Sequence, residues 1–197
     1  MASNVNSYYT NLYSLLSYGF VLQGELSNMP SFKETYEAIK ADVKNGEKNF
    51  NVECTMLQEG MQVEVKMDTK PFIFKIDAPP GLDGTNEGPS PLLMILGSVG
   101  ACIIAVSRFW SKIMDVPIEE MKVFSRGHIN LASIFGIDDN MLAGYDKLEP
   151  IIRIKSSAPK EKVEAMMEKV LTHCPIITNM KGASPISPKV EIKGLNE

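Results

Sequence analysis

The stretch from Pro89 to Met114 constrains the fold of this 197-residue chain more than any other part of the sequence. Its apolar residues fall on every side of a helical spiral, which is typical of a helix buried in a core. They are Leu92, Leu93, Met94, Ile95, Leu96, Val99, Ile103, Ile104, Val106, Phe109, Trp110 and Ile113. Small residues interrupt the run and Arg108 ends it, so fewer than the roughly 20 apolar residues of a membrane span stand together. The sequence therefore predicts a central core helix and no membrane partner.

Charge narrows the class of partner. The formal net charge is -4 and the sequence pI is about 5.3, whereas surfaces for nucleic acid or anionic membrane need concentrated Lys and Arg. We therefore expect small molecules or protein as partners, and no nucleic acid. The segment MASNVNSYYTNLYSLLSYGF lacks the basic start and the apolar run of a signal peptide, which indicates a cytoplasmic protein with reduced cysteines.

The amino-terminal part of the chain has a helical pattern. Apolar residues recur at helical spacing from Tyr8 to Leu16, and Ser31-x-x-Glu34 is a capping-box pattern that begins a second helix. Gly46 suits the end of that helix. We therefore expect a helical extension over residues 1–46 and a main domain over residues 47–197.

From Asn49 the hydrophobic period changes to two, which predicts half-buried strands. The alternating segments are residues 50–56, 61–67 and 72–76, separated by short turns, so they form a three-stranded antiparallel meander. Cys54 falls on the apolar face of this meander. A cysteine in such a place behaves as a small hydrophobe, and we interpret it as structural.

The pattern after the meander completes an α+β fold. A Pro/Gly loop enters the central helix at Ser90 and Pro91, which suit a helix cap and a first helical residue. Two further strands, an amphipathic helix, a short helix and a last strand follow. Their expected positions are residues 121–131 and 148–155 for the strands, a helix from Pro159 to Thr172, a helix after Pro175, and residues 189–193 for the last strand.

The three cysteines are Cys54, Cys102 and Cys174, and they include no C-x-x-C pair. With only His128 and His173 beside them, the sequence predicts neither a disulfide framework nor a metal centre, and no cofactor.

Two of the cysteines allow both a structural and a chemical interpretation. Cys174 precedes a proline at a predicted helix start, where unpaired backbone N–H groups stabilise a thiolate, but a cysteine there is also a tolerable cap. Cys102 lies in an apolar helix, which makes a thiol inert unless a cation or a hydrogen-bond donor reaches it. When each cysteine is considered alone, both the structural and the chemical interpretation remain open.

Two cysteine motifs occur in a fixed order: the helical G-A-C that ends GPSPLLMILGSVGAC, and the C-P near the end of FGIDDNMLAGYDKLEPIIRIKSSAPKEKVEAMMEKVLTHCPI. In this the chain resembles the OsmC/Ohr family, the osmotically induced and organic hydroperoxide resistance proteins, over roughly residues 49–193. The phrase Phe135-Gly136-Ile137-Asp138 is closest to an OsmC-like branch of less characterised function. The resemblance implies an OsmC-like fold and an intertwined homodimer with sites at the subunit interface.

The resemblance also implies roles for the cysteines. Cys102 is then the peroxidatic cysteine and Cys174 the resolving one, and an external thiol reduces the disulfide that they form. The family's peroxidases carry an arginine in the first hairpin and a glutamate after the proline at the helix entrance. Gln58 and Leu92 stand in these places, and neither is charged.

The two missing charges have candidate replacements: Arg126 or a lysine for the cation, and Glu87 for the carboxylate if the loop folds back. Without them, Cys102 should be a poor nucleophile at neutral pH. Two functions therefore remain. The first is a thiol-dependent reductase (peroxidase) of small or organic hydroperoxides, with Cys102 and Cys174 as catalytic residues. The second is a non-enzymatic OsmC-like protein that binds an apolar ligand at the dimer interface or senses oxidation.

Overall fold

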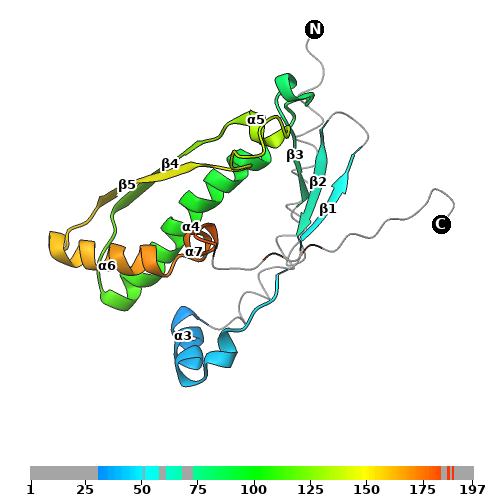
Figure 1. Cartoon of the computed structure of the whole chain (residues 1–197). Helices are drawn as coiled ribbons and strands as arrows, with labels where there is room; N and C mark the ends of the chain where they lie inside the picture. Colours follow the sequence, from blue (N-terminus) through cyan, green and yellow to red (C-terminus); the bar gives the residue numbers. More distant parts are fainter. Residues whose placement is uncertain are drawn as a thin grey trace, which may run out of the picture. The chain divides into compact units, whose positions relative to one another are not determined.

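The computed structural model describes residues 31–50, 52–57, 61–67, 73–182, 186 and 188, and its trace is drawn in Figure 1. The chain divides into two compact units, Met1–Asn51 and Val52–Glu197. The predicted helix near Tyr8, the turn that contains Gln58 and the predicted strand 189–193 lie outside the described residues. The predicted domain boundary between residues 46 and 47 stays a prediction.

In the first unit, helix α3 (Phe32–Ala41) begins at the predicted capping box. The Ser31 hydroxyl accepts a hydrogen bond from the Glu34 backbone N–H at 3.3 Å, and the Glu34 carboxylate accepts one from the Ser31 N–H at 2.7 Å. A 3-10 turn, η1 (Val43–Gly46), follows. The capping box is therefore confirmed, although the α-helix ends at Ala41, ahead of the predicted end at Gly46.

The second unit opens with the predicted meander. Strands β1 (Val52–Met56), β2 (Val63–Met67) and β3 (Ile73–Ile76) pair antiparallel in the order β1-β2-β3. Cys54 lies opposite Val65 in the register, but β1 is exposed along its whole length whereas Val65 is 4% exposed. The prediction that Cys54 is half-buried is thus wrong for the described residues, because none of them covers the surface on which β1 carries its apolar side chains.

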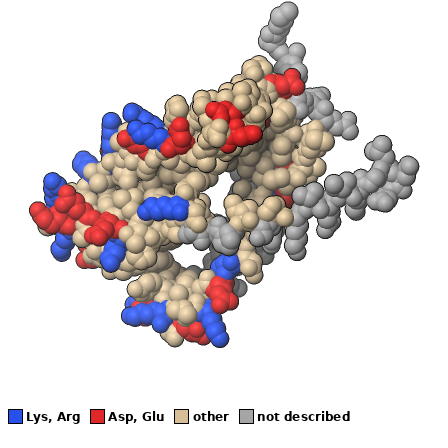
Figure 2. All heavy atoms as spheres, in the orientation of Figure 1, with Lys and Arg blue, Asp and Glu red and all other residues tan. Residues whose placement is uncertain are grey.

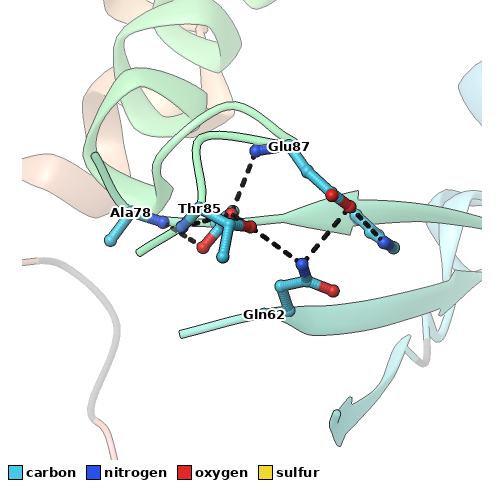
Figure 3. A network of polar contacts seen from close by, with 6 residues as sticks. Gln62, Ala78, Thr85 and Glu87 are labelled. Carbon is cyan, nitrogen blue, oxygen red and sulfur yellow. Dashed lines mark hydrogen bonds and ion pairs between the residues drawn. The ribbon is translucent and has the colours of Figure 1, made fainter. Parts of the chain in front are cut away.

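A buried carboxylate organises the loop after β3, which contains the turn η2 (Pro80–Leu82). Asp77 is 1% exposed and accepts hydrogen bonds from three backbone N–H groups and from the Thr85 hydroxyl (Figure 3). The N–H donors belong to Ala78, Thr85 and Glu87, and the side-chain amide of Gln62 donates to Thr85 and Glu87. These donors stabilise the charged form, the Thr85 hydroxyl most of all, and lower the pKa of Asp77 to about 2.

The central helix α4 (Pro91–Met114) forms as predicted. The Ser90 hydroxyl accepts a hydrogen bond from the Leu93 N–H, Pro91 is the first helical residue, and Asp115 ends the helix with φ 52°. One face of α4 is buried, and it consists of Val99, Gly100, Ile103, Val106 and Ser107. This face packs on strand β4 and on helices α6 and α7, whose bounds are given below (Figure 1).

The opposite face of α4 is exposed in the single chain, so the prediction of burial on all sides is wrong for one subunit. Leu93, Phe109 and Ile113 are 59%, 48% and 39% exposed. The 24-residue helix also has an 18-residue window with a hydropathy of 2.1, so length and composition alone satisfy a membrane span, contrary to the sequence argument. The packing of one face on strands and helices of the same unit is what supports its assignment as a core helix.

The remaining elements enclose that buried face. Strands β4 (Glu120–His128) and β5 (Lys147–Lys155) form an antiparallel pair, and α5 (Leu131–Ile134), α6 (Lys160–Thr172) and α7 (Pro175–Met180) complete the order. β4 ends before the predicted residue 131, because the Asn130 side chain accepts a hydrogen bond from the Ala132 N–H and caps α5. The core consists of Val99, Ile103, Val106, Val116, Met166, Val170 and Cys174. The predicted α+β arrangement is confirmed.

Small residues let β4 and α4 approach each other closely. A Cβ at Gly100 would lie 3.2 Å from the Ser125 hydroxyl and 3.6 Å from Val123 on β4. That hydroxyl is buried and has no hydrogen-bond partner within the described part of the chain.

Replacing Asp77 by Asn removes the buried charge with little change of shape. The folded pKa of about 2 lies below the unfolded value of about 3.9, so ionised Asp77 stabilises the fold above about pH 4, and this contribution is lost as the pH falls towards 2. We expect Asp77→Asn to lower the urea midpoint at pH 7 and to reduce the loss of stability between about pH 4 and pH 2. Urea titrations across this pH range measure both effects.

The matched control is Asp83→Asn, a carboxylate of the same loop with a left-handed backbone that Asn tolerates. Equal midpoints for the two variants at pH 7 would contradict the role given to Asp77.

Candidate functional site

The sulfur atoms of Cys102 on α4 and Cys174 before α7 lie 3.3 Å apart, although the residues are 72 positions apart in the sequence. The Cys174 thiol donates towards the Cys102 sulfur. Both cysteines are free thiols, and a disulfide with an S–S bond of about 2.0 Å would need an approach of about 1.3 Å. The structure thus brings the two predicted catalytic residues together.

Exposure differs sharply between the two thiols. Cys174 is 0% exposed and belongs to the core, whereas Cys102 is partly exposed. Solvent and small molecules therefore reach Cys102 before they reach Cys174.

Local sequence explains how Cys174 arrives there. Met166 and Val170, on the apolar face of α6, are fully buried and pack in the core that α4 helps to form. Pro175 starts α7 at its first helical position, so the chain turns at Cys174, which has an extended backbone. The Cys174 side chain makes no capping bond to α7, so its thiol is directed at Cys102 instead.

A backbone N–H at the start of α7 forms a hydrogen bond with Cys102. The Ile176 backbone N–H donates to Cys102, which favours the thiolate of Cys102 and lowers its pKa. Burial has the larger and opposite effect, and the neighbouring Cys174 adds to it because two thiolates so close would repel each other. The net result is a raised pKa for Cys102. The Ile176 N–H at this helix start thus acts on Cys102, and the Cys174 side chain makes no capping bond there.

The predicted replacements for the missing charges do not reach Cys102. Val123 and Ser125 face α4, so Arg126 lies on the other face of the strand, opposite Glu149 in the register. Glu87 is bound to the Lys75 ammonium at 2.6 Å, in the network of Figure 3. In the described part of this subunit, no charged side chain contributes to the pKa of Cys102.

The backbone of Leu92 forms a hydrogen bond with Tyr145, a residue that the sequence analysis did not identify. The Tyr145 hydroxyl donates to the Leu92 carbonyl oxygen at 2.8 Å. The Tyr145 ring occupies the place where a Cβ of Gly127 would lie, so only glycine fits at this point of β4. A glycine inside a strand is the signal that marks such a close approach.

The remaining polar groups form ordinary pairs. His128 bonds Asp146 at 2.8 Å, and His173 bonds the Lys169 carbonyl oxygen while its ring contacts Trp110. The described ranges contain no group of three or more His, Cys, Asp or Glu side chains that could hold a metal ion. On the face seen in Figure 2, Lys and Arg are interspersed with Asp and Glu, which is unlike the single-sign surface that nucleic acid requires.

Two kinds of hollow lie along α4. A cavity of about 250 Å³ is lined by Val99, Leu148, Pro150, Ile177, Met180 and Lys181. Larger depressions of about 370 and 470 Å³ share Ile104, Arg108 and Lys112 on the exposed face of α4. Both kinds of hollow are lined by neighbours of Cys102 in the sequence: Val99 lines the smaller one, and Ala101 and Ala105 line one of the larger ones.

The sequence model of the family described as OsmC-like protein matches residues 84–189, which is more than half of the chain. This chain therefore belongs to the OsmC-like protein family. No functionally curated protein matches it.

Several solved structures have the same fold. An OsmC-like protein from Mycoplasma pneumoniae is 16% identical with a TM-score of 0.59, and the match covers 69% of this chain and 89% of that one. An organic hydroperoxide resistance protein from Elizabethkingia anophelis, with thiocyanate bound, is 20% identical with a TM-score of 0.53 and coverages of 69% and 90%. One described as a putative organic hydroperoxide resistance protein from Vibrio cholerae, with captopril in one active site, is 13% identical with a TM-score of 0.51 and coverages of 79% and 89%.

The raised pKa of Cys102 gives a direct test of the site. We expect the rate of alkylation of Cys102 by iodoacetamide to rise with an apparent pKa above the value of about 8.5 for free cysteine, because burial outweighs the single backbone donor. The measurement uses Cys54→Ser protein and peptide mass spectrometry to follow Cys102 alone. A midpoint well below 8.5 would show that a cation outside the described residues or from a second subunit acts on this thiol.

Proposed function

We propose that this protein is a thiol-dependent reductase of organic hydroperoxides, with Cys102 as the peroxidatic and Cys174 as the resolving cysteine. The observation that carries the proposal is the pair of reduced thiols at 3.3 Å with unequal exposure. The names of the hydroperoxide resistance proteins that share the fold agree with this class of substrate.

The geometry supports a two-step reaction. The Cys102 thiolate attacks one oxygen of the peroxide, the O–O bond breaks, the alkoxide takes a proton and leaves as an alcohol, and Cys102 becomes a sulfenic acid. The Cys174 sulfur then attacks the Cys102 sulfur, and the hydroxyl leaves as water with the thiol proton. The resulting disulfide is reduced by two equivalents of an external thiol, which becomes a disulfide itself.

The rate of the first step is limited by the thiolate fraction of Cys102. Each unit of pKa above the ambient pH lowers that fraction about tenfold, partly offset by the higher nucleophilicity of a more basic thiolate. Among the described residues, the Ile176 N–H favours the Cys102 thiolate and no Lys or Arg side chain assists it. We therefore expect slow turnover compared with relatives that keep an arginine and a glutamate.

The same feature favours a second function. A weakly activated thiol pair, together with an apolar cavity that Val99 of α4 and Ile177 of α7 help to line, also suits an OsmC-like protein that binds an apolar ligand or senses oxidation without rapid turnover. The two functions differ in whether peroxide is consumed catalytically.

We also infer that the protein acts as a cytoplasmic homodimer. Two apolar surfaces are exposed in the single chain: the face of α4 with Leu93, Phe109 and Ile113, and strand β1 with Val52 and Met56. Exposed apolar surface of this kind is typical of an interface between subunits. A second subunit would bury α4 on both faces.

The cysteines give the first test of function. We expect Cys102→Ser to abolish consumption of cumene hydroperoxide in the presence of dithiothreitol, because the attacking sulfur is removed. In the absence of dithiothreitol, Cys174→Ser should allow one oxidation per subunit and leave a sulfenic acid that dimedone traps. Cys54→Ser is the matched control and should keep the native rate, since Cys54 lies on β1. Unchanged peroxide consumption by Cys102→Ser would exclude the reductase.

The subunit interface gives a second test. Sedimentation at micromolar concentration should give twice the chain mass of 21.8 kDa. Phe109→Asp should shift the protein towards the monomer, because it places a charge on the exposed face of α4, whereas Tyr36→Asp on α3 should leave the mass unchanged. A native protein that sediments at the chain mass would contradict the dimer.

A further inference from the structure

The outer face of strands β4 and β5 carries an excess of positive charge. Val123 and Ser125 point at α4, so the residues that alternate with them, and the partners of those residues on β5, lie on the opposite face. Five of the ten residues on this outer face are Lys or Arg, and two are Glu. The cations are Lys122, Arg126, Lys147, Arg153 and Lys155. The outer face is therefore basic, although the chain as a whole has a net charge of -4.

Two of these cations, both arginines, are left for another molecule. The other three interact with a carboxylate of the same unit, in the pairs Lys122–Glu120, Lys147–Glu149 and Lys155–Glu119. Arg126 and Arg153 are exposed and form no ion pair with a described residue. A guanidinium group binds a carboxylate through two parallel hydrogen bonds, so these two side chains can each hold one carboxylate.

An apolar pair lies between the two arginines. Phe124 is opposite Ile151 in the register, and Phe124 is 46% exposed. Arg126 follows Phe124 by two residues on β4, and Arg153 follows Ile151 by two residues on the antiparallel β5. The arginines therefore lie on either side of the apolar pair, four residues apart along the sheet, which is about 13 Å. An exposed aromatic centre with arginines around it is typical of a contact between proteins.

We propose that this outer face binds an extended, acidic segment of another protein. Two carboxylates of that segment, four positions apart, contact Arg126 and Arg153, and an apolar side chain between them contacts Phe124. An extended segment separates such carboxylates by about 13 Å and matches the arginines, whereas a helix brings residues four apart to about 6 Å. The inference goes beyond the reductase function and does not rest on it.

The surroundings of Phe124 favour protein over nucleic acid as the occupant. The Arg153 guanidinium lies 4.9 Å from the centre of the Phe124 ring, so it already occupies a face of the ring that a base would need for stacking. The net charge of -4 also repels a long polyanion more than a short segment with few carboxylates. A second subunit packed on the exposed face of α4 leaves this side of the sheet open, because α4 lies on the other side of β4.

Fluorescence anisotropy with labelled synthetic peptides tests the outer face. The probe contains the segment Glu-Ser-Leu-Ser-Glu, and the comparison peptide has Gln in place of both Glu. We expect the wild-type protein to bind the acidic probe about three- to tenfold more tightly, the range that two exposed ion pairs supply. Arg126→Gln combined with Arg153→Gln should remove this preference. Phe124→Ser should weaken the binding of both peptides, because the apolar contact is lost.

The matched control is Lys162→Gln combined with Lys169→Gln, which removes two charges from exposed positions of α6 and should keep the preference. Arg126→Gln alone breaks no described ion pair and should lower the preference in part, so the test does not depend on the stability of the double variant. Cys102→Ser protein should bind the probe as the wild type does, which separates this result from the outcome of the peroxide experiments.

Four results would overturn the inference: no binding of the acidic probe, equal affinity for the two peptides, equal weakening by the two double variants, or tighter arginine-dependent binding of a short oligo-dT strand than of the probe. The last result would assign the outer face to nucleic acid.

Discussion

Burial of one face of α4 is the interaction on which the rest of the second unit depends. Val99, Ile103 and Val106 form a continuous apolar stripe, and Met166 and Val170 of α6 pack in the same cluster with no exposed surface. Fully burying side chains of this size contributes about 1.5–3 kcal/mol each, so the contact holds α6 and the turn after it in place. The position of Cys174 opposite Cys102 is a consequence of this hydrophobic packing, with no ion pair or metal of the described residues needed to produce it.

Among the described residues, no Lys, Arg, Asp or Glu side chain acts on Cys102, and this limits the reactivity of the thiol in one subunit. A backbone N–H supplies a fixed dipole, whereas an arginine supplies a full charge and several donors, and hydrogen bonds to charged groups are roughly twice as strong as neutral ones. Ile176 therefore compensates burial only in part, as the net direction of the pKa shift shows.

Elements with a strong local signal could be predicted from the sequence, and contacts made across the fold could not. Ser31, Ser90 and Pro175 cap or begin helices as expected, because capping depends on residues within one turn. The hydrogen bond of Tyr145 to α4 and the donation of Ile176 to Cys102 depend on long-range packing that no periodicity encodes. The exposure of one face of α4 could not be predicted for a related reason. An apolar pattern indicates that a helix face is covered by other residues, but it does not show whether they belong to the same chain.

The unequal depth of the two thiols has a consequence for the survival of the protein under oxidative stress. A sulfenic acid is converted irreversibly to a sulfinic acid when a second oxidant molecule arrives before it is consumed. Cys174 already lies at 3.3 Å, within the same packed core, so ring closure needs a small local movement and no diffusion. In the proposed reaction, the interval in which Cys102 can be lost to over-oxidation is therefore set by an internal motion and is independent of the supply of external reductant.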